Sequence, residues 1–115
     1  MQIVFVVAAD WTLRTAVRAE LRESGIEALG MESPDDVGRA VAAGEMPALL
    51  LLEGIPALTA DPAVRNLARH VPTVLIASRT EKTDLPPVAA VLYRPVRIAE
   101  IVECIRRLLE RPRLA

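Results

Sequence analysis

Aromatic residues, cysteine and long apolar runs are scarce in this chain of 115 residues. Phe5, Trp11 and Tyr93 are the only aromatic side chains, so the core is expected to be built from Val, Leu, Ile and Ala. The single Cys104 excludes an internal disulfide and a metal cluster of thiolates. No apolar run approaches the roughly 20 residues that span a bilayer, and no basic segment precedes the first one. We therefore expect a cytoplasmic protein without membrane contact.

The chain also lacks an excess of charge of either sign, since it has 14 basic and 15 acidic residues and a net charge of −1. The arginines are scattered among acids, so the sequence gives no general attraction to nucleic acid. The loop after the first apolar run contains no glycine, which counts against a phosphate-binding loop for nucleotides. Enzyme classes that need such a loop are thereby disfavoured.

Five short apolar runs, rich in Val, Ile and Leu, are present instead. They show little polar alternation, as is typical of strands that are covered on both faces. The predicted strands are residues 3–9, 26–31, 48–52, 73–78 and 88–93.

Helical signals separate most of these runs. Asp10 is a plausible N-cap for a helix that ends at Gly25, and Ser33-Pro34 opens a helix that ends at Gly44 and carries Val37, Ala40 and Val41. The further predicted helices are one from Asp61-Pro62 to His70 and one with an apolar stripe from Ile98 to Leu109. Segment 79–87 is polar, ends in proline and has room for about one helical turn.

Strands alternating with helices predict an α/β fold, a doubly wound parallel sheet with helices on both faces. Functional groups in such sheets gather at the carboxyl ends of the strands. The residues at that edge are expected to be Ala8, Ala9, Asp10, Glu53, Ala77, Ser78, Tyr93, Arg94 and Pro95.

At these residues the chain resembles the receiver domain of two-component response regulators. The stretches "MPALLLLE", "VPTVLIAS" and "VLYRPV" resemble the family's strand ends "PDLVLLD", "PVIMLTA" and "YLTKPF", in the same order. The resemblance implies a flavodoxin-like (βα)5 sandwich with strand order 2-1-3-4-5. Only 17 residues separate Ala77 from Arg94, fewer than is usual in the family, so the fourth helix is expected to be shortened. Residues 1–110 would form the domain, and 111–115 a tail or the start of a linker.

Carried over onto this sequence, the family's active site is degenerate. The acidic pair falls on Ala8 and Ala9, and the phosphoacceptor aspartate falls on Glu53, 44 residues after Ala9. The positions of the switch Thr or Ser, of the lysine and of the proline that follows a cis peptide fall on Ala77, Arg94 and Pro95. Two alanines supply no oxygen ligands for Mg²⁺, so we expect no metal, no cofactor and no enzymatic phosphoryl transfer.

Several roles remain open at this edge. Glu53 either pairs with Arg94, as a permanent imitation of a phosphorylated aspartate, or merely ends a strand in solvent. Asp10 either caps its helix or is a leftover acid of the metal cluster. Trp11 is large enough to plug the vacated metal pocket.

The sequence thus predicts a degenerate receiver that acts as a phosphorylation-independent protein interaction module. Protein partners, including a second copy of the chain, would meet Val91, Tyr93, Ile101 and Ile105, beside the shortened helix and on the last one. The alternative is a receiver that still binds a phosphoryl group or a small anionic ligand around Glu53 and Arg94.

Overall fold

The five predicted strands form one parallel sheet in the order β2-β1-β3-β4-β5. The computed structural model describes residues 2–78 and 87–110. The strands are β1 (Ile3–Val7), β2 (Glu27–Met31), β3 (Leu49–Glu53), β4 (Thr73–Ala77) and β5 (Ala90–Tyr93). This order and the parallel pairing confirm the predicted flavodoxin-like fold.

The central strands lack polar alternation because both of their faces are buried. Successive side chains point to opposite faces of a strand, so Val4 and Val6 join one core while Phe5 and Val7 join the other. The four leucines 49–52 divide between the two cores in the same way, and none is more than 2% exposed. Each contributes roughly 1.5–3 kcal/mol by leaving water.

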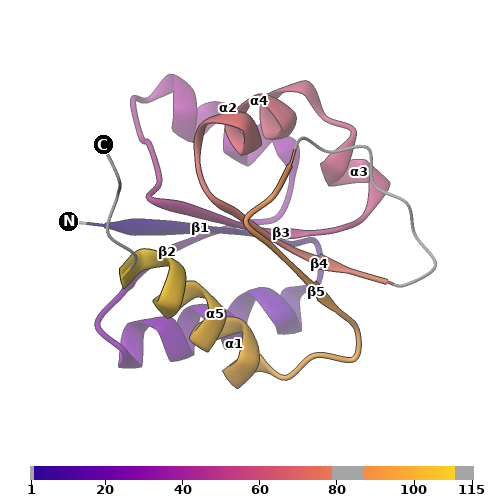
Figure 1. The fold of residues 1–115 in the computed structure, drawn as a ribbon. Helices are drawn as coiled ribbons and strands as arrows, with labels where there is room; N and C mark the ends of the chain where they lie inside the picture. Colours follow the sequence, from indigo (N-terminus) through magenta and orange to yellow (C-terminus); the bar gives the residue numbers. More distant parts are fainter. Residues whose placement is uncertain (1, 79–86, 111–115) are drawn as a thin grey trace.

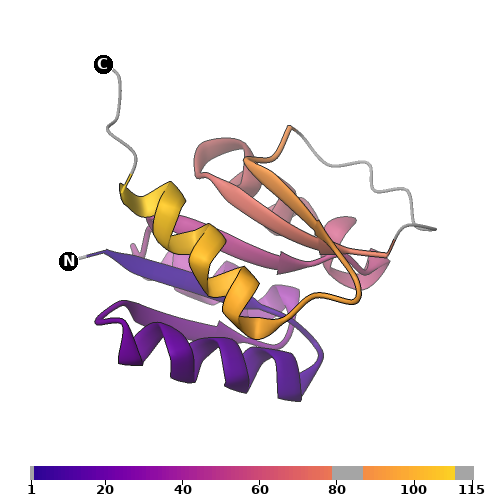
Figure 2. The ribbon, with the colours of Figure 1, turned by 60° about the horizontal axis from the view of Figure 1, so that its bottom comes forward.

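Helices cover both faces of the sheet, as Figure 1 shows. On one side lie α1 (Trp11–Glu23) and α5 (Ile98–Glu110), side by side in Figure 2 and in contact. On the other side lie α2 (Pro34–Ala42), α3 (Pro56–Thr59) and α4 (Pro62–His70). None of the helices in the described part of the chain is long and apolar enough to cross a membrane.

The helix boundaries follow the predicted capping residues. The Asp10 carboxylate accepts a hydrogen bond from the N–H of Leu13, 3.2 Å away, and this settles its role as the N-cap of α1. The Asp61 carboxylate caps α4 through the N–H groups of Ala63 and Val64. Gly25 follows the C-cap of α1 with φ of +77°, a conformation that favours glycine.

The structure differs from the sequence predictions in several details. The short helix α3 was not predicted, since four residues are too few to show a periodicity. β1 ends at Val7, which leaves Ala8 and Ala9 in a loop, and β3 continues through Glu53. Val37 is buried, but Val41, on the same face one turn later and next to the last residue of α2, is 37% exposed.

Two predicted segments lie outside the described residues, and one strand begins later than predicted. The shortened helix expected within 79–87 falls almost wholly on residues 79–86, and the expected tail on 111–115; both lie outside the described residues. β5 begins at Ala90, two residues later than expected.

Candidate functional site

The carboxyl ends of β1, β3, β4 and β5 meet at one edge of the sheet, because the strands are parallel. Glu53 is the last residue of β3, and Arg94 directly follows β5. The loop between β1 and α1 passes over the same edge. These three segments bring together the Glu53 carboxylate, the Arg94 guanidinium and the backbone amides of the loop before α1.

The Glu53 carboxylate binds both of these neighbours. Its Oε1 accepts hydrogen bonds from the N–H groups of Ala9 and Asp10, at 2.8 and 3.1 Å. Its Oε2 accepts a hydrogen bond from Arg94 Nη2 at 2.8 Å. Glu53 is only 7% exposed, so the interpretation that it merely ends a strand in solvent is wrong.

The amides that bind Glu53 lie directly before α1, one in the loop at Ala9 and one at the N-cap Asp10. The N–H of Asp10, the N-cap residue, is among the first donors of a helix, which have no partner within it. The helix dipole also favours negative charge at this end. The carboxylate of β3 therefore stabilises the beginning of a helix that is 43 residues away in sequence.

Arg94 is held by its backbone and leaves part of its side chain in water. Its N–H donates to the carbonyl oxygen of Ala77, 2.9 Å away, and the Arg94–Pro95 peptide bond is cis, as the sequence suggested. The Arg94 side chain is 44% exposed, while that of Glu53 is 9% exposed. The ion pair is thus buried on its acidic side only.

The residues at this edge do not fit the Mg²⁺ ion that the family resemblance would imply. Mg²⁺ needs oxygen ligands in a near-octahedral shell. Ala8 and Ala9 carry none on their side chains, the Asp10 carboxylate caps α1, and both Glu53 oxygens are already hydrogen-bonded. Within residues 2–78 and 87–110, no group of three or more His, Cys, Asp or Glu residues is placed to hold a metal ion.

Gly54 brings the end of β3 close to β4. Its N–H donates to the carbonyl oxygen of Ile76 at 2.7 Å, and a Cβ on Gly54 would stand 2.8 Å from that oxygen. Ala77, at the end of β4, is 4% exposed and carries no hydroxyl, while Ser78 is half-buried. The close approach explains the glycine that follows Glu53.

Several predicted site and interface residues lie elsewhere than expected. Trp11 is 67% exposed and does not plug a pocket. Ile101 and Ile105 are fully buried, because α5 turns them toward α1 and the sheet, so they are wrong as partner contacts. Val91 and Tyr93 are 37% and 47% exposed, as an interface would require.

Sequence reasoning missed the two backbone amides that bind Glu53. Amides leave no residue-type signal, although the N-cap pattern at Asp10 placed unpaired donors there. It also missed a hollow of about 500 Å³ beside the ion pair, lined by Leu13, Ile76, Arg94, Pro95 and Val96.

By sequence, the chain matches no protein-family model and no curated protein. Solved structures nevertheless resemble it closely in fold. A response regulator receiver protein from Burkholderia phymatum is 21% identical, with a TM-score of 0.71 and 95% of each chain covered. A CheY-like receiver domain protein from Methanospirillum hungatei JF-1 is 15% identical, with a TM-score of 0.76 and 94% of each chain covered.

The N-terminal domain of a response regulator/sensory box/GGDEF protein from Carboxydothermus hydrogenoformans gives a TM-score of 0.74 at 13% identity, again over 94% of both chains. These similarities extend over nearly the whole chain. The chain therefore has the fold of a response regulator receiver domain.

Proposed function

We propose that this chain is a degenerate receiver domain that acts as a phosphorylation-independent protein interaction module. One observation carries the proposal: the carboxylate at the phosphoacceptor position is already occupied. Glu53 accepts three hydrogen bonds, two from the backbone amides of Ala9 and Asp10 and one from Arg94. The negative charge of the Glu53 carboxylate, which would be the nucleophile, is thus already balanced by Arg94 and the two amides.

The surroundings of Glu53 also disfavour a phosphoryl transfer. The transition state of such a transfer needs positive charge around the moving group, which metal ions usually provide. The residues at this edge do not suit Mg²⁺, and Ala77 has no hydroxyl to bind a phosphoryl oxygen. The function is therefore expected to rest on binding and not on modification of Glu53.

Amide NMR spectra with Mg²⁺ and beryllofluoride test this proposal, with a working receiver domain as the control for the reagents. We expect no saturable shift in the signals of Glu53, Ser78 and Arg94. Intact mass after incubation with a small-molecule phosphodonor is expected to stay unchanged. A saturable shift, or a mass increase by one phosphoryl group that Glu53→Gln abolishes, would overturn the proposal.

The outer face of β5 is the surface that we propose for a protein partner. Val91 and Tyr93 are exposed neighbours there on one side of the strand, while Ala90 and Leu92 face α5. Exposed apolar patches of this kind commonly mark contacts. If a second copy is the partner, sedimentation will show a dimer that Val91→Asp dissociates and Met46→Asp, a change at another exposed apolar residue, does not.

A small anionic ligand at Arg94 is the second candidate. The exposed part of its side chain lines the hollow of about 500 Å³, next to Pro95 and Val96. Titration with inorganic phosphate, followed by the amide signals of residues 94–96, tests this function. Saturable shifts that Arg94→Met removes would support it, and linear shifts shared by the variant would exclude it.

A further inference from the structure

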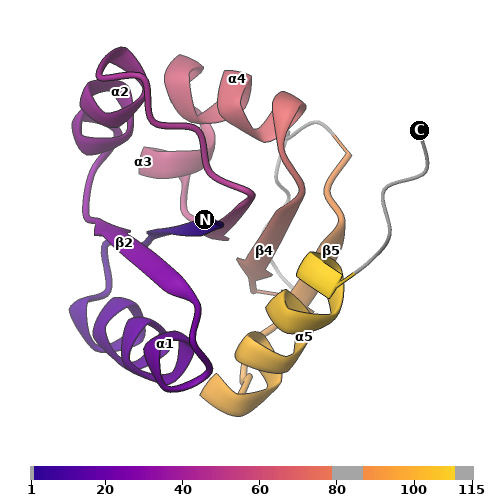
Figure 3. The ribbon, with the colours of Figure 1, turned by 90° about the vertical axis from the view of Figure 1, so that its left-hand side faces the viewer.

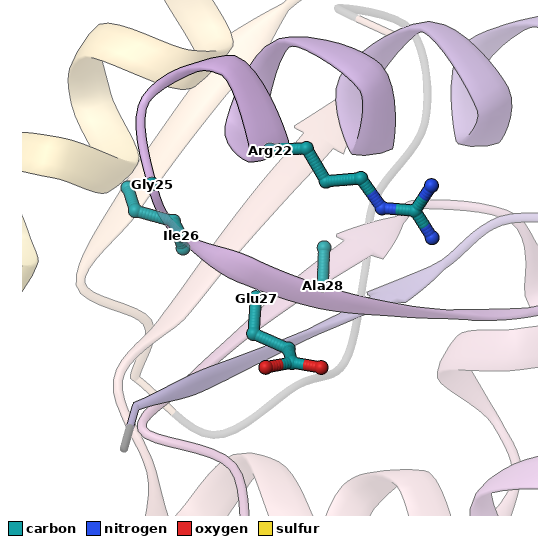
Figure 4. A pocket seen from close by; sticks show the side chains of 5 residues that line it. All are labelled: Arg22, Gly25, Ile26, Glu27 and Ala28. Carbon is teal, nitrogen blue, oxygen red and sulfur yellow. The ribbon is translucent and has the colours of Figure 1, made fainter.

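Three arginines of α1 form a row above the outer strand β2. Arg14, Arg18 and Arg22 are four residues apart, so they share one side of the helix at intervals of about 6 Å. The stems of Arg14 and Arg18 lie against Gly30, where a Cβ would stand 2.8 Å from Arg18 Cδ. Arg22 continues the row along a hollow of about 430 Å³ that it lines with residues 25–28. Figure 4 shows its side chain on the same side of β2 as Ala28.

In the described part of the chain, acidic side chains do not pair with this row. None of the three arginines has an ion pair within the described residues 2–78 and 87–110. Arg14 donates to the carbonyl oxygen of Ala8 at 2.6 Å, and Arg18 Nε has no hydrogen-bond partner in the described part of the chain. Glu27 is near in sequence but points to the other side of β2 (Figure 4).

β2 is also an edge strand with an open side. In the described sheet it pairs only with β1, and Figure 3 shows it at the near edge between α1 and α2. The Met31 carbonyl faces β1, because it accepts from the N–H of Ala8. Backbone groups alternate in direction along a strand, so those of Ala28 and Gly30 point outward. These unpaired groups lie directly beneath the arginine row.

We propose that this edge binds an extended, acidic segment of a partner protein, which adds a strand beside β2. Alternate residues of a strand are about 6.6 Å apart and share one face, close to the spacing of the arginines. Every second residue of the segment would therefore carry a carboxylate toward the arginine row. The residues between would face Leu29, which is 36% exposed, and are expected to be apolar.

Two other occupants fit this edge less well. A nucleic acid would meet the exposed Glu27 on the other side of β2, and it could not use the open backbone groups of a strand. A second copy, joined through antiparallel β2 strands about a two-fold axis, would bring the two arginine rows together, and like charges repel. β2 and β5 are the two opposite edge strands of the sheet. This proposal is therefore independent of the function proposed above.

Binding of labelled peptides to the full chain tests the proposal. The panel consists of capped eight-residue peptides that alternate Asp or Glu with Val, Leu or Thr, followed by fluorescence anisotropy and by amide NMR. We expect saturable binding that shifts the signals of Ala28 and Gly30. Binding is expected to weaken as salt rises from 0.1 to 1 M, since the screening length falls from about 10 to about 3 Å. N-methylation of alternate backbone amides in the peptide is expected to abolish it.

Variants of the protein separate the row from charge in general. An exposed ion pair is worth up to about fivefold in affinity, so Arg18→Glu with Arg22→Glu is expected to weaken binding by about tenfold or more. Arg69→Glu, at an exposed arginine of α4, is the matched control and is expected to leave affinity unchanged. Circular dichroism will verify that each variant is folded.

Three outcomes would overturn the proposal. The first is that no peptide of the panel binds at millimolar concentration. The second is that a labelled oligonucleotide binds more tightly than every peptide and shifts the same amide signals. The third is that sedimentation shows a dimer that the double arginine variant alters, which would assign the edge to a second copy.

Discussion

Replacing Glu53 by alanine is expected to destabilise the fold more than replacing its partner Arg94 by methionine. The two side chains form one ion pair but differ in burial, with 9% of the Glu53 side chain and 44% of the Arg94 side chain exposed. Glu53 also binds two backbone amides that Arg94 does not touch. The two substitutions therefore remove different numbers of interactions.

The magnitudes follow from what each substitution leaves behind. Glu53→Ala leaves the N–H groups of Ala9 and Asp10 without their acceptor, at a cost of about 1–3 kcal/mol each where water cannot replace it. Both residues are exposed, so the lower end applies and the total is about 2–3 kcal/mol. The Arg94 side chain is 44% exposed, so in Arg94→Met water can take its place beside a carboxylate that keeps its two amide bonds, and the cost is about 1–2 kcal/mol. The double variant is expected to lose about 1 kcal/mol less than the sum.

Urea unfolding followed by circular dichroism measures these differences, provided that the slope of each transition is unchanged. Glu103→Ala is the control, because Glu103 pairs with Arg106 and Arg107 at 3.9 and 3.8 Å on an exposed face of α5. Its effect is expected to stay within about 0.5 kcal/mol. Equal losses for the two single variants, or a coupling below about 0.3 kcal/mol, would refute the reasoning.

Three further predictions concern other parts of the chain. Gly54→Ala is expected to destabilise the fold by about 1–3 kcal/mol, because its Cβ would stand 2.8 Å from the Ile76 carbonyl oxygen. Gly38→Ala, in open space within α2, is expected to stabilise the fold by about 0.5–1 kcal/mol. Urea unfolding of both variants compares these effects. The pKa of Asp36 is lowered, chiefly by the N–H of Glu32 and then by Ser33 and Arg39. Asp36 therefore stabilises the fold above its unfolded pKa of about 3.9, and this contribution is lost as the pH falls through its lower folded pKa. The stability difference between the wild type and Asp36→Asn is therefore expected to shrink below about pH 4, and a constant difference in unfolding curves from pH 7 to pH 2.5 would contradict this. Burial raises the pKa of the Cys104 thiol, against an opposing effect of Arg107. A thiol reagent at pH 7 is therefore expected to modify the native protein slowly and the urea-unfolded protein rapidly. Equal rates of modification would contradict this.

Most of the fold could be predicted because each strand is an apolar run bounded by helix signals. The leucines 49–52 needed a sheet covered on both faces, and the caps at Asp10 and Asp61 fixed where helices begin. The helix α3 escaped prediction because four residues leave no pattern. The orientation of α5 was also not predicted, since its apolar stripe alone did not indicate that Ile101 and Ile105 would be fully buried in the core.

The candidate site could be predicted only as far as side chains define it. Glu53 and Arg94 each follow a strand of a parallel sheet, so their meeting at one edge followed from topology. The amides of Ala9 and Asp10 have no such signature, and they decide that Glu53 is bound and not solvated. The four-residue spacing of Arg14, Arg18 and Arg22 is present in the sequence, but only the structure places this row above the open strand β2.

The division of the strands between two cores has a consequence for how this sequence can change over time. Neighbouring residues such as Val4 and Phe5 belong to different cores, because they face opposite sides of the sheet. A loss of volume at Val4 can be compensated at Val6 or at Leu49 on the adjacent strand, but not at Phe5. Related sequences are therefore expected to covary at positions two apart or across the strand register, and to vary independently at adjacent positions. Each face of the sheet can thus be rebuilt without disturbing the other.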